Sequence, residues 1–149
     1  MIDETEQADR LVVSPAGGSE ARWVVSRPVD PDGDGYTHTV DVELSDDGIT
    51  ARGPAAFSGR TPENLRDFLV ALEKDWRGWR GARSWTSMEG EMTVEARHDG
   101  RGHVSLAITL RRADLNHTPD AWSARVVVTV EAGEELRRVA DAADRLLRP

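Results

Sequence analysis

Three carboxylates stand at alternate positions in a short glycine-rich stretch near the start of the chain. Asp30, Asp32 and Asp34 match positions 1, 3 and 5 of a calcium-binding loop, and Gly35 matches position 6. Position 12 would be Asp41 rather than the usual longer glutamate, and no helices are expected on either side. Asp, Pro and Gly also form tight solvated turns that need no ion. We favour the turn and keep calcium binding as the alternative.

A second stretch, residues 77–85, interleaves cations with indole rings and holds no acidic residue. This composition is typical of surfaces that stack nucleic-acid bases and of protein-interface hot spots, and both uses require exposed rings. The alternative, which we favour, is that the indoles fill the joint between a helix and a sheet while the arginines lie over them. If the stretch does bind a partner, the interface candidates are Trp79, Arg80, Arg83 and Trp85.

Two histidines near a turn invite a metal or acid–base interpretation. His98 and Asp99 stand in an expected hairpin turn, and His103 begins the following strand. A turn histidine and an outward strand histidine are not expected to aim at one point, and Asp99-Gly100 is explained by the turn alone. We therefore expect no catalytic or metal-binding role for the pair.

Common catalytic signatures are missing from the chain. It contains no Gly-x-Ser-x-Gly elbow, no His-Glu-x-x-His, no Walker loop and no dinucleotide fingerprint. It also contains no cysteine, which excludes disulfides, cysteine-ligated metals and thiol catalysis. We expect no cofactor and no metal, although a site built from scattered residues would carry no motif.

The charge of the chain is acidic and uneven. The net charge is −8, and residues 1–60 hold 12 acidic and 5 basic residues, a net charge of −7. Nucleic acids and anionic membranes reward cationic surfaces, so neither is expected as a partner. A basic protein is the partner class that this charge favours.

The length of 149 residues is typical of one domain, and we expect a single domain over residues 1–149 with residues 1–10 loose. Apolar runs are only a few residues long, which predicts no membrane span. The opening Met-Ile-Asp-Glu-Thr-Glu is acidic and no apolar stretch follows it, so no secretory or transit signal is expected. A cytoplasmic location is the resulting expectation.

The elements that position these residues follow from hydrophobic periodicity. Alternation and short apolar runs predict strands at residues 11–13, 22–25, 36–44, 49–52, 84–97, 103–111 and 122–131. In the third of these, Tyr36 shares the apolar side with His38 and Val40. In the hairpin of the fifth and sixth, Val94 and Val104 must share a face. A three-residue loop satisfies this condition and places Glu95 opposite His103.

Two amphipathic helices complete the expected set. Thr61 and Pro62 are typical of a helix start, and the apolar stripe that follows runs from Leu65 to Trp76. A second stripe covers residues 134–147. The order of elements lacks regular β-α-β alternation. We therefore predict an α+β fold in which one antiparallel sheet of about seven strands carries both helices on one face.

Three local patterns carry a resemblance. They are Gly-Trp-x-Gly-x-Arg-x-Trp at residues 78–85, His-Asp-Gly-x-Gly-His-Val at 98–104 and Glu-Ala-Gly-Glu-Glu-Leu at 131–136. With these patterns the chain resembles a small, functionally uncharacterised bacterial domain family from high-GC genomes, over about residues 36–147. The resemblance implies a stand-alone single-domain protein and brings no activity or catalytic residue.

Taken together, these features predict a non-enzymatic protein-binding domain. Small acidic α+β proteins of this kind are similar in type, though not in motif, to immunity proteins, which neutralise toxins. An immunity-like role is therefore the particular form of protein binding that we expect. A calcium-binding or small-molecule-binding domain is the alternative, and an enzyme whose site has no visible motif comes third.

Overall fold

The computed structural model describes residues 9–15, 18–60, 64–112 and 121–148. Most of the segment expected to be loose, residues 1–10, therefore lies outside the described residues, and Arg10 already begins the first strand. The described ranges hold an α+β fold, as predicted, with these elements: β1 (Arg10–Val13), β2 (Arg22–Ser26), β3 (Thr37–Asp46), β4 (Ile49–Ser58), α1 (Leu65–Lys74), β5 (Ala82–Thr86), β6 (Met92–His98), β7 (His103–Arg111), β8 (Ser123–Glu131) and α2 (Glu134–Leu146).

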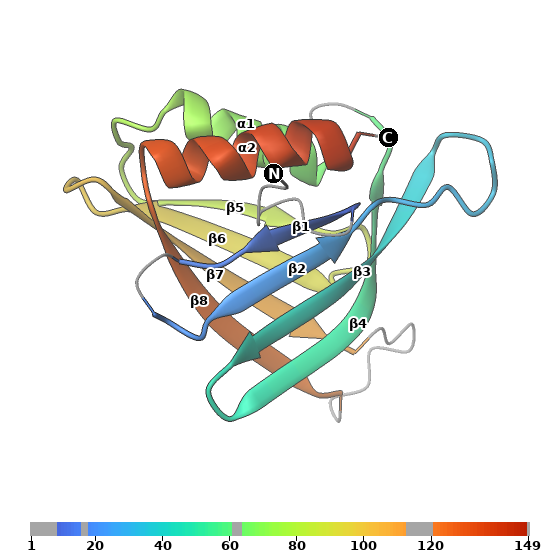
Figure 1. Cartoon of the computed structure of the whole chain (residues 1–149). Coiled ribbons are helices and arrows are strands. Elements are labelled where there is room, and N and C mark those ends of the chain that lie inside the picture. The colour runs from blue at the N-terminus through green and yellow to red at the C-terminus, as the bar shows by residue number, and fades with distance from the viewer. Residues whose placement is uncertain (1–8, 16–17, 61–63, 113–120, 149) are drawn as a thin grey trace.

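The strands form two four-stranded antiparallel sheets, ordered β1-β2-β3-β4 and β5-β6-β7-β8, and not one sheet of about seven strands. The prediction of a single sheet is wrong because alternation shows that a strand has one apolar face but not which element covers that face. Here the apolar faces of the two sheets cover each other (Figure 1). The strand count also rises, because the predicted strand 84–97 is divided by a turn at residues 87–91 into β5 and β6.

One hydrophobic core lies between the sheets. Its largest fully buried side chains include Trp23 and Phe57 from the first sheet and Leu106 and Ile108 from the second. At one corner the rings of Phe57 and Trp85 meet edge to face, with centroids 6.2 Å apart. A backbone bond links the sheets at the same corner, where the amide of Met88 donates to the carbonyl of Ala56 at 2.8 Å.

The two helices lie against each other on one side of the molecule. α2 contacts β1 of the first sheet and β8 of the second, and Figure 1 shows both helices across the side where β1 and β5 run. They close the space between the sheets and do not cover the face of a single sheet, because each inner face is already covered by the other. Arg66 of α1 joins Asp144 of α2, with Nε 2.8 Å from Oδ1. Neither helix is long and apolar enough to cross a membrane.

The helix ends differ slightly from the predicted ones. α1 begins after Asn64, whose side chain accepts the amide hydrogen of Asp67 at 3.0 Å. The predicted cap, Thr61, lies outside the described residues. The helix ends at Lys74, so Trp76 lies beyond it.

Candidate functional site

The loop between β2 and β3 projects from the body of the molecule (Figure 1). We call residues 29–36 the acidic loop. Asp30 closes it from within, because its Oδ1 accepts the amide hydrogen of Gly33 at 2.9 Å and its Oδ2 accepts that of Gly35 at 2.8 Å. Both glycines have positive φ angles, a conformation that suits residues without a side chain. The loop is thus folded by one of its own carboxylates.

This geometry bears on the calcium interpretation. Both carboxylate oxygens of Asp30 are engaged by backbone amides, as in a turn that needs no ion. Within the described ranges, no group of three or more histidine, aspartate or glutamate side chains is arranged to hold a metal ion. The hydrogen bonds of Asp30 are those that the turn interpretation expects.

The acidic loop displays two apolar side chains. Val29 is 62% exposed and Tyr36 is 61% exposed. The prediction that Tyr36 faces the core is wrong, because β3 begins one residue later and the loop directs the ring outwards. The guanidinium of Arg60 lies 5.7 Å from the centre of the Tyr36 ring.

The base of the acidic loop is fixed to the end of β4. Gly59 donates its amide hydrogen to the carbonyl of Tyr36 at 3.0 Å. A Cβ atom at Gly59 would stand 2.2 Å from the carbonyl oxygen of Gly35 and 2.9 Å from the His38 ring. Only glycine permits this close approach of the two backbones.

The four partner-interface candidates of residues 77–85 occupy different environments. Trp85 lies in the core and is 8% exposed, whereas Arg80 is exposed. Trp79 is half-buried and donates from Nε1 to the carbonyl of Ala96 at 3.3 Å. Arg83 lies over the Trp79 ring, with its guanidinium carbon 4.9 Å from the ring centre. Whether they bind a partner stays a prediction.

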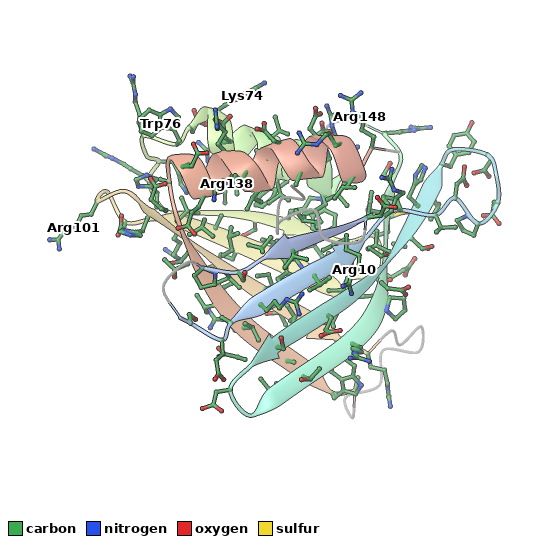
Figure 2. All side chains as sticks on the ribbon, viewed as in Figure 1. Arg10, Lys74, Trp76, Arg101, Arg138 and Arg148 are labelled. Carbon is green, nitrogen blue, oxygen red and sulfur yellow. The ribbon has the colours of Figure 1, made fainter. Side chains whose placement is uncertain are left out.

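Two further residues complete the surroundings of this stretch. Arg83 also pairs with Asp75, at 2.7 Å between Nη1 and Oδ2. Trp76, which the sequence pattern placed on the buried helix stripe, is 44% exposed with Arg77 stacked on it at 5.2 Å (Figure 2). Arg77 and Arg83 lie over indole rings, as the favoured interpretation expects. Burial decreases from Trp85 to Trp79 to Trp76, so Trp76 is not buried as that interpretation expects.

His98 holds a structural position. Its Nδ1 accepts the amide hydrogen of Gly100 at 2.9 Å, so in this arrangement Nε2 carries the ring proton and donates to the carbonyl of Trp76 at 2.8 Å. The ring also packs edge to face against Trp79, with centroids 5.4 Å apart. His98 therefore ties the β6–β7 turn to the segment that follows α1.

The β6–β7 turn is longer than predicted, and this separates Glu95 from His103. Glu95 pairs with Ala107, while His103 pairs with Glu131 on β8. The predicted register is wrong by an even number of residues, so the apolar faces still match. The cause is Asp99, whose Oδ1 accepts the amide hydrogens of residues 101 and 103 and so holds the wider turn.

Asp99 and His103 do lie near each other. The amide of Arg101, followed by that of His103, lowers the pKa of the Asp99 carboxyl. His103 Nδ1 stands 3.6 Å from Asp99 Oδ2, whereas His98 is engaged with Trp76. The ring nitrogens of the two histidines therefore have different partners: the Asp99 carboxylate faces His103, whereas His98 bonds the carbonyl of Trp76 and the amide of Gly100.

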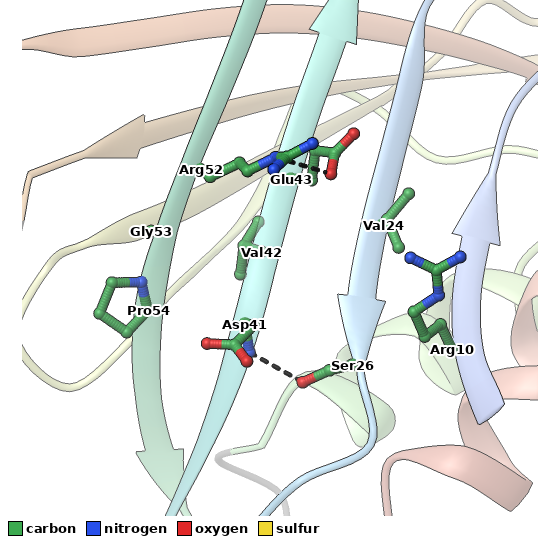
Figure 3. A pocket seen from close by; sticks show the side chains of 9 residues that line it. All are labelled: Arg10, Val24, Ser26, Asp41, Val42, Glu43, Arg52, Gly53 and Pro54. Atoms are coloured by element: carbon green, nitrogen blue, oxygen red, sulfur yellow. Dashed lines mark hydrogen bonds and ion pairs between the residues drawn. The ribbon is translucent and has the colours of Figure 1, made fainter. Parts of the chain in front are cut away.

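A groove of about 630 Å³ lies on the outer face of the first sheet (Figure 3). It combines outward charges with apolar groups and small residues drawn from all four strands. Its lining consists of Arg10, Val24, Ser26, Asp41, Val42, Glu43, Arg52, Gly53 and Pro54. This groove was not predicted from the sequence, because its residues come together only through the register of four strands. The available signal was the set of outward positions in each strand.

The described part of the chain is thus an α+β protein of two packed antiparallel sheets, with a projecting acidic loop and a charged groove. The chain belongs to a family of unknown function (DUF6228), whose model matches residues 18–149. This confirms the predicted membership of an uncharacterised family. No curated protein and no solved structure matches the chain.

Proposed function

We propose that the protein is a non-enzymatic protein-binding domain that engages a basic partner through the acidic loop. The observation that carries the proposal is the exposure of Tyr36 and Val29 beside the carboxylates of Asp32 and Asp34. Tyrosine is enriched among the residues that dominate binding energy, because its ring is large and its hydroxyl can bond a partner. Neighbouring carboxylates would pair with the cations of that partner.

The internal bonds of the loop support this proposal. Asp30 and Asp34 together accept three amide hydrogens within the loop, and Gly59 holds the loop base. A loop that is already ordered loses less conformational entropy on binding than a loop that must fold on its partner. The exposed ring is therefore presented at low entropic cost.

The charge of the whole chain adds long-range attraction. A net charge of −8 favours encounter with a cationic surface and disfavours nucleic acid and anionic membranes as partners. An immunity-like role, in which the basic partner is a toxin, is the particular form of this function that we propose. A cytoplasmic location is part of the same proposal, and fractionation of cells that make the protein tests it.

Of the alternatives, small-molecule binding has a supporting observation, namely the groove on the first sheet. Calcium binding is less well supported, because Asp30 already accepts backbone hydrogens with both oxygens. An enzymatic role has no comparable support in the arrangement of His98 and His103.

The test uses the partner captured by the full-length protein and measures association by stopped flow across a salt series. The double variant Asp32→Asn/Asp34→Asn keeps an acceptor for the Tyr36 amide and removes two charges. We expect slower association with a weaker salt dependence, because steering by exposed charges acts mainly on the association rate. Tyr36→Ala is expected to speed dissociation, by about tenfold or more if the ring is a hot spot.

A control variant removes the same number of charges elsewhere. Glu20→Gln/Asp141→Asn changes two exposed acids, one before β2 and one on α2. If this control slows association as much as the loop variant does, the overall charge rather than the acidic loop directs binding. The proposal would be contradicted if neither the association rate nor the dissociation rate changed in any of the acidic-loop variants.

A further inference from the structure

The register of the first sheet arranges the outward side chains of the groove in two rows. One row runs across all four strands as Arg10, Ser26, Asp41 and Pro54, and the next runs as Val24, Glu43 and Arg52. The amide of Asp41 donates to Ser26 Oγ at 2.8 Å, which fixes the hydroxyl in the middle of the first row (Figure 3). The groove is therefore built on sheet positions and not on a loop.

The two charged residues of the second row, Glu43 and Arg52, form an ion pair with each other, whereas Arg10 and Asp41 of the first row do not. Arg52 Nε pairs with Glu43 Oε2 at 3.0 Å. Arg10 and Asp41 have no ion-pair partner within the described part of the chain. The Nε of Arg10 is moreover shielded from solvent and lacks a hydrogen-bond acceptor among the described residues. Among the described residues, the groove thus holds one cation and one anion without an ion-pair partner.

The spacing of the strands that carry these two charges sets the length of a ligand. Arg10 and Asp41 stand two strands apart, which corresponds to about 10 Å between their Cα atoms. An extended chain of two or three residues spans about 7–11 Å. Between the two charges, Val24 is 4% exposed and gives the groove an apolar floor, with Pro54 at one side.

We propose that this groove binds short zwitterionic peptides of two or three residues. The peptide carboxylate pairs with the guanidinium group of Arg10, and the terminal ammonium group pairs with Asp41. Ser26 Oγ lies between them, within reach of the peptide group, and Val24 contacts an apolar side chain. This function is separate from partner binding by the acidic loop, so either can fail without the other.

The test is a titration of the full-length ¹⁵N-labelled protein with the dipeptide Ala-Leu, followed by amide NMR shifts. We expect saturable shifts at Ser26, Asp41 and Arg52, at millimolar peptide. N-acetyl-Ala-Leu lacks the ammonium group and Ala-Leu amide lacks the carboxylate. Each of these two peptides is expected to bind about three- to tenfold more weakly than Ala-Leu, since each loses one charge-assisted contact.

Two variants assign the charges to their ends. Arg10→Gln should lose the preference for a free carboxylate but keep that for a free ammonium group, and Asp41→Asn should do the reverse. Arg125→Gln, an exposed change on the outer face of the other sheet, is the control and should bind Ala-Leu like the parent. Thermal melts verify that each variant remains folded.

Three results would overturn the proposal. They are the lack of saturable shifts with Ala-Leu, shifts that lie outside the first sheet, and a dependence on neither or only one of the two charged ends. Equal binding of all peptides by Arg10→Gln, Asp41→Asn and the parent would show that the two charges do not select the ligand.

Discussion

Glu131 is an example of one side chain that organises the start of a helix. Its carboxylate accepts the amide hydrogens of Gly133 at 2.7 Å, Glu134 at 2.6 Å and Glu135 at 3.3 Å. The first amides of a helix have no hydrogen-bond acceptor within the helix. A negative charge near this end also interacts favourably with the helix dipole. The amide of Gly133 is the main cause that lowers the pKa of the Glu131 carboxyl.

We predict that Glu131→Gln lowers the melting temperature at neutral pH but not in strong acid. A lowered folded-state pKa means that the ionised carboxylate stabilises the fold above its unfolded pKa. This stabilisation is lost as the pH falls through the folded pKa. Melting temperatures of parent and variant should therefore converge towards acidic pH. Glu20→Gln, at an exposed position, is the control, and a difference that is constant with pH would refute the role of the charge.

For the tryptophans of residues 76–85, the sequence predicted the contacts with arginine but not the burial of each ring. All three stand in one short stretch rich in arginine, yet Trp85 lies in the core, Trp79 is half-buried and Trp76 is largely at the surface. Spacing predicted that arginines would lie over indoles, and Arg77 and Arg83 do so. The order of burial of the three indole rings could not be predicted from the sequence, because it depends on where the helix ends and on which strand follows it.

At the scale of elements, regular alternation was sufficient to predict the best strands. β3, β7 and β8 are buried at every second residue along most of their length, in the pattern read from the sequence. The division between β5 and β6 was missed, because residues 87–91 contain a single glycine and no dipeptide typical of hairpins. The sequence also could not show which element packs against the apolar face of each sheet, because alternation determines only the direction in which each side chain points.

We predict that two tryptophan variants differ strongly in stability. Trp85→Ala should lower the free energy of unfolding by about 3–5 kcal/mol, because it leaves a cavity next to Phe57 where β4 meets β5. Trp76→Ala removes an exposed ring stacked by Arg77 and should cost about 1 kcal/mol or less. Urea denaturation measures both values, and similar losses for the two variants would contradict this placement.

At the scale of the whole molecule, the two proposed sites belong to the first sheet and its loops. The acidic loop connects β2 to β3, and the groove crosses β1 to β4. Residues 1–60, which include these elements, carry a net charge of −7, so the acidic half was visible in the sequence. The groove was not visible in the sequence. The two residues proposed to select its ligand, Arg10 and Asp41, are 31 positions apart in the chain and line one groove only because of strand pairing.

Each sheet of the protein is built from strands that follow one another directly in the chain, so strand pairing stays within each half. The halves meet mainly through side chains, with the Met88 to Ala56 bond at one corner. This predicts that the chain can be divided into fragments 1–60 and 61–149 that reassemble on mixing. Each fragment alone would expose an apolar sheet face and should lack stable tertiary structure. Near-ultraviolet circular dichroism should recover as equal amounts are combined, and an unchanged spectrum would show that the covalent connection is needed for folding.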